Sequence, residues 1–285
     1  MCDVAVIVLA FNEELNIEHA LQSVCGWARE VHVVDSGSTD QTPAVAERFD
    51  CELHYHAFDD YARQRNWALS ELPVRSEWVL FLDADEWLPT AIKDEIAATI
   101  AGNPIENGFY LNRRLLWMGK WVRRGYYPTW ILRLFRYGKG RCEQRAVNEH
   151  IVVDGKVGRL KHDFVHEDRN PISRWVAKHD RYATAEAQAL VTPGTEDPGN
   201  LWSGQATRKR WIRRHIWNRM PTLVRPVLYY GYRYFLRGGF LDGRAGLAYH
   251  VLQGLYFPML IDIKYLELVR GREARPARVR DPLGE

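Results

Sequence analysis

Residues 78–87 read Trp78-Val79-Leu80-Phe81-Leu82-Asp83-Ala84-Asp85-Glu86-Trp87. The apolar residues at the start predict a buried strand, which the acidic residues end abruptly. At an extended strand end, carboxylates two residues apart point to the same side. Asp83 and Asp85 could therefore hold a hard divalent cation and leave positions open for phosphate oxygens. Taken alone, the motif is better explained as a solvated turn in which Asp85 and Glu86 start the next helix, so the metal-binding interpretation depends on the surrounding sequence.

Three earlier strands are predicted, at Val4–Ala10, Glu30–Val34 and Cys51–Tyr55. Helices are expected between and after them, at residues 12–24, 42–49, 60–69 and 89–100. Asn12 is expected to cap the first helix. The buried stripe of that helix is predicted from its apolar spacing to contain Ile17, Ala20, Leu21 and Val24.

Strands that alternate with helices predict an α/β fold with a mostly parallel sheet and right-handed crossovers. Sites in such sheets lie beyond the carboxyl ends of the strands. Asn12, Asp35 and the pair Asp83 and Asp85 each follow a predicted strand. We therefore expect three polar elements to converge at one edge, which favours a binding site over a simple turn.

The pattern changes after residue 107. Strands are predicted at 109–116, 120–124, 130–137 and 150–154, with another at 157–162, and they read as an antiparallel extension. A helix is expected over 172–190. The Pro- and Gly-containing segment 192–199 is the clearest linker.

Composition limits the class of protein. A chain of 285 residues suits one large domain, or one with an appendage, and 46% apolar residues exclude global disorder. The four scattered cysteines form no C-x-x-C pair, so they predict neither a zinc site nor a disulfide framework and fit a reducing compartment. The first residues do not have the pattern of a signal peptide, and a cytoplasmic location is expected.

The charge is divided unevenly along the chain. Residues 1–199 carry 23 basic and 30 acidic side chains, a net −7, whereas residues 200–285 carry 16 and 6, a net +10. Residues 200–261 also interleave ten basic side chains with many aromatic ones. This pattern predicts interfacial helices on an anionic membrane surface. A helical subdomain with solvated arginines and a single membrane-spanning pass remain alternatives, and nucleic acid is not expected because no recognisable module accompanies the basic patch.

Three motifs, in this order, resemble the family 2 glycosyltransferases, and most closely the bacterial lipopolysaccharide-core and exopolysaccharide glucosyltransferases. They are Val6-Ile7-Val8-Leu9-Ala10-Phe11-Asn12-Glu13-Glu14, Val33-Val34-Asp35-Ser36-Gly37-Ser38-Thr39-Asp40 and Phe81-Leu82-Asp83-Ala84-Asp85-Glu86. The segment Gln64-Arg65-Asn66-Trp67-Ala68-Leu69 is similar to that branch too. The resemblance covers roughly residues 3–170.

The resemblance implies a Rossmann-like GT-A fold, Mg²⁺ or Mn²⁺ as cofactor, a UDP-sugar donor and inversion at the anomeric carbon. We expect a transferase domain at 1–191, with a donor half at 1–105 and an acceptor half at 106–170, a linker at 192–199 and a membrane-associating helical region at 200–285. Asp35 would contact uridine, and Asp85, with Asp83 nearby, would hold the metal. The expected donor-binding residues are Ala10, Asn12, Glu14, Asp35, Arg63, Arg65, Asp83 and Ala84. Glu14 alternatively fits a capping role and the two arginines a solvated helix face.

Two residues of the second half complete the expected site. Direct inversion needs a carboxylate base, and the resemblance places it at Glu149, after Arg133-Leu134-Phe135-Arg136. His166 is expected to complete the metal sphere, with a purely structural role as the alternative. The family often has a second acid where this chain has Ser36, which weakens the assignment of uridine.

The sequence thus predicts an inverting, metal-dependent hexosyltransferase at the inner face of the plasma membrane. It would transfer glucose from UDP-glucose to a lipid-linked saccharide or lipopolysaccharide core. A sugar-phosphate nucleotidyltransferase is disfavoured because Phe11-Asn12-Glu13-Glu14 replaces the Gly-rich basic loop that such an enzyme needs. A non-catalytic protein that binds membranes or nucleic acid through the basic tail leaves the strand-end acids unexplained.

Overall fold

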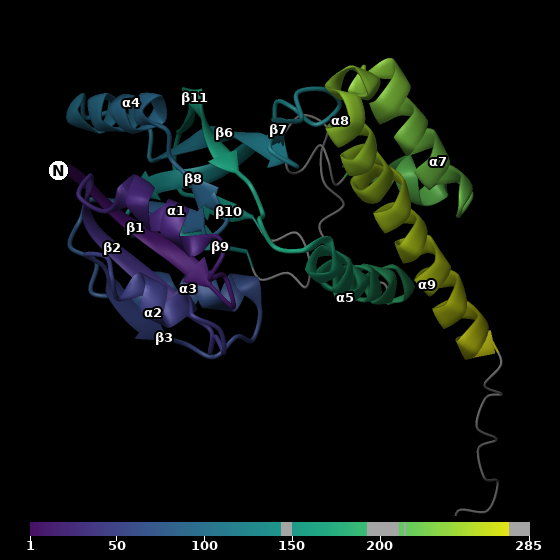
Figure 1. Ribbon diagram of the computed structural model, residues 1–285, viewed down its shortest axis with the longest axis horizontal. Coiled ribbons are helices and arrows are strands. Elements are labelled where there is room, and N and C mark those ends of the chain that lie inside the picture. The colour runs from purple at the N-terminus through teal and green to yellow at the C-terminus, as the bar shows by residue number, and fades with distance from the viewer. Residues whose placement is uncertain (144–149, 193–210, 214, 274–285) are drawn as a thin grey trace, which may run out of the picture. The chain divides into compact units, whose positions relative to one another are not determined.

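The computed structural model describes residues 1–143, 150–192, 211–213 and 215–273 (Figure 1). Contacts divide the chain into two compact units. The first comprises Met1–Ile172 with Arg237–Leu247, and the second Ser173–Leu236 with Ala248–Glu285. The linker expected at 192–199 lies, except for Thr192, outside the described residues. The helix expected over 172–190 is observed, and nearly all of it belongs to the second unit.

Strands and helices alternate through the first hundred residues, as predicted. The strands are β1 (Cys2–Ala10), β2 (Ala28–Asp35), β3 (Glu52–Tyr55), β4 (Trp78–Asp83) and β5 (Glu86–Trp87). The helices are α1 (Ile17–Val24), α2 (Thr42–Ala46), α3 (Tyr61–Glu71) and α4 (Thr90–Ala101). β1 pairs in parallel with β2 and β4, and β2 pairs in parallel with β3. The predicted parallel sheet is confirmed, with strand order β3-β2-β1-β4.

Helices cover both faces of this sheet (Figure 1). Alternate residues of β1 point to opposite faces, so Val4, Val6 and Val8 join one core with α1, α2 and α4. Ala5 and Ile7 join a second core with α3. Burial on both faces explains why the strands are almost continuously apolar. The predicted stripe of α1 is confirmed, because all four of its residues are buried.

The sheet continues through the second half of the first unit as β8-β6-β11-β5. The strands there are β6 (Gly108–Trp117), β7 (Lys120–Trp121), β8 (Trp130–Arg136), β9 (Gly140–Cys142), β10 (Ile151–Val153) and β11 (Val157–His166). Most pairings are antiparallel, as predicted, but β6 and β11 run parallel. β11 also extends to His166, beyond its predicted end, and β9 was not predicted.

The prediction that Asn12 caps the first helix is wrong. The helix begins at Ile17, and Asn12 has a positive φ of 55°. Its side-chain oxygen instead accepts a hydrogen bond from the Thr39 N–H at 2.7 Å, and its own N–H donates to Ser38 Oγ at 2.8 Å. Thr39, 27 residues away along the chain, therefore bonds the side chain that local capping rules assigned to the helix.

The remaining elements lie after the sheet. The α-helices are α5 (Ile172–Val191), α7 (Val224–Gly231), α8 (Gly243–Tyr249) and α9 (Phe257–Glu273). The short 3-10 helices are η1 (Trp217–Arg219) and η3 (Gly239–Asp242), and the π-helices are η2 (Tyr232–Leu236) and η4 (His250–Tyr256). Within the second unit, Arg225 and Asp262 form a buried ion pair, with Nε and Oδ1 2.9 Å apart. One basic side chain of the tail is thus used in packing. None of the described helices combines the length and apolar character that crossing a membrane requires.

Candidate active site

The carboxyl ends of three parallel strands meet at one edge of the sheet. Ala10 is in register with Asp35 across β1 and β2, and Leu9 is in register with Asp83 across β1 and β4. The loops that follow these strands therefore start side by side. The predicted convergence of polar elements is confirmed.

The loops after β1 and β2 are locked together. Asp35 is buried and accepts hydrogen bonds from the N–H groups of Gly37 and Ser38, both at 2.9 Å, and from Ser38 Oγ. Ser38 Oγ and the Thr39 N–H are in turn the partners of Asn12. The Asp35 carboxylate is therefore fixed by its own loop before any ligand arrives.

Some of the other expected donor-binding residues contact loops or solvent, and the rest reach the acidic motif. The Ala10 carbonyl accepts the Ser36 N–H at 3.0 Å, so its position is set by the same loop. Glu14 accepts the Gln41 N–H at 2.9 Å, in keeping with a capping role. Arg63 pairs with Asp59 and Asp60 on a solvated face of α3. The ion pairs that Arg63 makes are therefore with these two aspartates and not with the acidic motif.

Arg65, two residues further along α3, does reach the acidic motif. Its Nη2 lies 3.2 Å from Asp83 Oδ1, and only 12% of its side chain is exposed. A second arginine, Arg133 of β8, places its Nη2 2.6 Å from Asp83 Oδ2 and 2.8 Å from Glu86 Oε1. Glu86 Oε2 accepts the Asp83 N–H at 3.0 Å. Asp83 is thus held by two arginines, and Ala84 is buried between the acids.

Burial and charge shift the proton affinities of these acids in opposite directions. Burial by itself would raise the pKa of Asp83, but Arg133 and Arg65 hold that pKa well below its usual range. Burial raises the pKa of Glu86 to about 7, against the attraction of Arg133. Opposite shifts in neighbouring carboxyls are common at functional sites.

Glu86 lies in a strand, so the alternative in which it starts a helix is wrong. β5, which Glu86 begins, pairs antiparallel with the end of β11, opposite His166. The Asp85 carbonyl also accepts the Glu167 N–H at 2.9 Å. These backbone contacts bring His166 to the acidic motif from 80 residues away.

Asp85, Glu86 and His166 offer ligand atoms that all lie within 4.8 Å of one another. His166 Nδ1 is 3.3 Å from Asp85 Oδ1 and 3.9 Å from Glu86 Oε1. Nδ1 is buried and makes no hydrogen bond to the part of the chain that is described. Burial disfavours the charged imidazole, but the Asp85 carboxylate holds the pKa of His166 above its usual value. An orphaned ring nitrogen beside two carboxylates fits a divalent cation.

Glu86 and Arg133 were not predicted as site residues. A signal for Arg133 was present, because it interrupts an otherwise apolar strand between Leu132 and Leu134. A charged side chain at such a position requires a buried partner. The identity of the partner depends on strand pairing, which the sequence did not specify.

Glu149 lies outside the described residues, within 144–149. The residues on either side are anchored near α3. The Glu143 N–H donates to the His150 carbonyl at 3.0 Å, and the Asn66 amide bonds the backbone N–H and carbonyl of Cys142 at 2.8 and 2.9 Å. Asn66 directly follows Arg65, which contacts the acidic motif.

Replacing Arg133 with methionine should lower the free energy of unfolding by about 3–5 kcal/mol, because it leaves the buried Glu86 carboxylate without its counter-ion and takes one of two arginines from Asp83. Urea unfolding of the full chain measures this change. The control is Arg29→Met, which removes the exposed pair between Arg29 and Asp3 and should cost at most about 1 kcal/mol. Equal destabilisation by the two variants would show that Arg133 is not the centre of the acidic motif.

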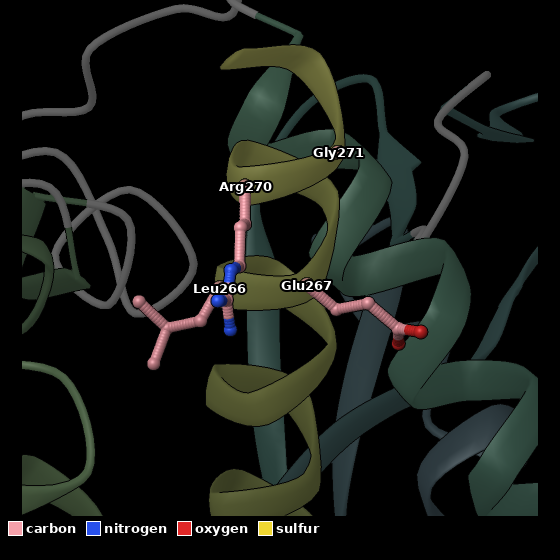
Figure 2. Close-up of a pocket in the computed structure, with 4 residues that line it drawn as sticks. All are labelled: Leu266, Glu267, Arg270 and Gly271. Carbon is pink, nitrogen blue, oxygen red and sulfur yellow. The ribbon is translucent and has the colours of Figure 1, made fainter. Parts of the chain in front are cut away.

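A hollow beside α9 in the second unit is distinct from this edge. Among the described residues it is lined by Leu266, Glu267, Arg270 and Gly271. In Figure 2 Leu266 and Glu267 project from opposite sides of the helix. The described lining offers one acidic and one basic side chain, which do not by themselves make a catalytic arrangement.

The chain is similar to glycosyltransferases in sequence and in fold. Residues 5–113 match the family model Glycosyl transferase family 2. The chain is 26% identical over 264 residues to the lipopolysaccharide core biosynthesis glycosyltransferase LpsC of Rhizobium meliloti (strain 1021), covering 86% of this chain and 88% of LpsC. It is also 26% identical over 210 residues to an uncharacterized glycosyltransferase of Rickettsia bellii (strain RML369-C), covering 70% of each chain.

A solved structure supports the fold. The mannosyltransferase PcManGT from Pyrobaculum calidifontis, in complex with GDP-Man and Mn²⁺, superposes with a TM-score of 0.51 at 19% identity. The superposition covers 93% of this chain and 87% of PcManGT. The chain has the GT-A fold. Its resemblance to the family 2 glycosyltransferases, which the motifs indicated, extends over residues 5–113.

Proposed function

We propose that this glycosyltransferase transfers a hexose from a nucleoside diphosphate in a metal-dependent reaction and inverts the anomeric carbon of the sugar. The observation that carries the proposal is the meeting of Asp85 with His166 at the edge where Asp35 is fixed. Carboxylate and imidazole ligands at a strand-end edge suit a cation that binds a diphosphate. Mg²⁺ or Mn²⁺ bound there would offset the charge that develops on the leaving diphosphate.

The residues around the metal ligands position the donor. Asp35 and Asn12, already held by their loops, offer fixed polar groups for the nucleoside, and Arg65 offers a guanidinium for the diphosphate. Ser36 Oγ accepts a hydrogen bond from Gln64 Nε2 at 2.8 Å, so its own hydroxyl proton is available as a donor to a base carbonyl. We favour UDP-glucose as the donor, with GDP-mannose as the second candidate because PcManGT binds GDP-Man.

Release of UDP from UDP-glucose tests this proposal. The rate should fall to background after treatment with EDTA and return on addition of Mn²⁺ or Mg²⁺, because the diphosphate leaves poorly without a counter-charge. GDP-mannose, run in parallel, identifies the donor. A rate unaffected by EDTA would contradict the metal requirement.

We place the acceptor at a membrane surface, as a lipid-linked saccharide or a lipopolysaccharide core. LpsC, named for lipopolysaccharide core biosynthesis, supports this placement. So does the net charge of +10 on residues 200–285. α7 and η2 add the exposed apolar side chains Val224, Val227, Leu228, Phe235 and Leu236. Val227 and Leu228 lie three and four residues after Val224, so these three share one face of α7. Such a basic, partly apolar surface suits the inner face of the plasma membrane as a peripheral attachment.

The double variant Phe235→Glu/Leu236→Glu should bind anionic liposomes at least about tenfold more weakly, because it puts charge on the proposed membrane-facing side. Co-sedimentation with vesicles of phosphatidylglycerol and phosphatidylcholine measures the change. The control is Ile105→Glu, at an equally exposed apolar position in the first unit. Binding that is retained in the double variant would remove α7 and η2 from the membrane surface.

A further inference from the structure

Two histidines and a glutamate lie together on β2 and β3, on strand bodies rather than in the strand-end loops. His32 is in register with Glu52, and Val34 is in register with His54. Because residues two apart on a strand point to the same side, Glu52 and His54 both extend beside His32. His32 is completely buried, His54 partly and Glu52 half exposed, so the cluster runs from the core to the surface.

The three ligand atoms form a nearly regular triangle. His32 Nδ1 and His54 Nε2 are 3.2 Å apart, and Glu52 Oε2 lies 3.6 Å from each of these nitrogens. A tetrahedral zinc ion binds nitrogen and oxygen at about 2.0–2.2 Å, which separates its ligand atoms by about 3.3–3.5 Å. The observed spacing matches that requirement without rearrangement of the strands.

A second carboxylate lies behind the buried histidine. Glu30 Oε2 is 3.6 Å from His32 Nε2. The other oxygen of Glu30 is fixed by the N–H groups of Arg75 and Ser76, at 2.8 and 2.6 Å. At 3.6 Å this carboxylate is beyond hydrogen-bond distance, but its charge favours a proton on the far nitrogen and leaves the near one to bind the ion. Here that near nitrogen is Nδ1, the atom in the triangle.

We propose that His32, Glu52 and His54 form a second metal site, for Zn²⁺ or another divalent transition metal that favours imidazole. Two nitrogens and one carboxylate oxygen are a common zinc ligand set, with water in the fourth position on the exposed side of Glu52. β3 is the edge strand of the sheet and pairs only with β2 among the described strands. An ion held by both strands would fasten this edge beside the strand that ends at Asp35.

A shared proton between the two imidazoles is the competing explanation. It accounts for the 3.2 Å contact between His32 and His54. It does not account for Glu52 being equidistant from both nitrogens, or for the carboxylate behind His32. The two explanations differ in one measurable property, which is the affinity for zinc.

The test is calorimetric titration of metal-stripped full-length protein with ZnCl₂. An Asp85→Ala background removes a ligand of the donor edge, so that a competing site there does not obscure the result. One zinc ion per chain should bind in this background. Adding His54→Ala or Glu52→Gln should weaken that binding, by at least about 100-fold for His54→Ala. Both positions are partly exposed, and Glu52→Gln keeps the size of the side chain, so at least one variant should fold.

The matched control is His162→Ala. It removes a histidine whose Nδ1 lies 2.8 Å from Glu95, outside the cluster, and it should leave zinc binding unchanged. Co²⁺ in place of Zn²⁺ should give the visible absorption of a tetrahedral site in the Asp85→Ala protein. No zinc binding in that background, or binding that survives both His54→Ala and Glu52→Gln, would overturn the proposal in favour of the shared proton.

Discussion

Asp85→Ala is expected to slow sugar transfer by about 10³-fold or more. Charge stabilisation by a bound metal is worth several kcal/mol, and about 4 kcal/mol corresponds to a factor of 10³ in rate. Asp85 and His166 face each other at 3.3 Å, and Asp85 is the carboxylate of the motif that Arg133 does not hold. Its removal should therefore take away metal binding while the ion pairs of Asp83 and Glu86 remain.

Steady-state release of UDP measures this loss, and two comparisons make it specific. Asp94→Ala removes an exposed carboxylate from α4 of the same unit and should change the rate by less than about twofold. Urea unfolding of Asp85→Ala should show that the fold is kept. A folded Asp85→Ala enzyme with the wild-type rate would show that the strand-end acids are not the metal site.

Glu149→Gln is expected to lower kcat by about 10²–10⁴-fold and to leave donor affinity nearly unchanged. General-base catalysis contributes a factor of this size, and glutamine keeps the shape of the side chain while it removes the basic oxygen. The acids at the strand ends are engaged by arginines or lie beside His166, so a base for the acceptor hydroxyl must come from another part of the chain. The residues next to 144–149 are tied to α3 through Asn66, beside the donor edge.

Separate measurements of kcat and of the dissociation constant for the donor distinguish a base from a binding residue. Glu143→Gln serves as the control, since it alters the neighbouring glutamate. If Glu149→Gln instead weakens donor binding at unchanged kcat, or if Glu143→Gln has the same effect, the base must be another residue.

The parts of the fold that local patterns control were predicted well. Continuous apolar runs placed β1, β2 and β4, and the spacing of Ile17, Ala20, Leu21 and Val24 gave the buried side of α1. The parallel order followed because strands joined by helical crossovers must run in the same direction. Asp35, Asp83 and Asp85 then fell at one edge, where the structure has them.

The parts that depend on distant pairing were not predicted. A strand with a period of two residues looks the same whether its neighbour is parallel or antiparallel, so the parallel pairing of β6 with β11 left no local trace. Asn12 was assigned to the wrong partner because Ser38 and Thr39, 26 and 27 residues away, form its hydrogen bonds instead. The role of Arg133 required knowledge of which acids face β8.

The most direct measurement for the account as a whole is the thermal shift of the wild-type protein with UDP-glucose, with Mn²⁺, and with both. At a ligand concentration of about 100 times Kd, binding adds about 2.7 kcal/mol, which should raise Tm by about 5–10 °C with UDP-glucose and Mn²⁺ together. UDP-glucose alone or Mn²⁺ alone should give a much smaller rise in Tm. For Asp85→Ala, the two ligands together should raise Tm no more than one ligand alone. An equal rise with UDP-glucose in the presence of EDTA, or no rise with UDP-glucose or GDP-mannose under any condition, would contradict a metal-dependent nucleotide-sugar site at this edge.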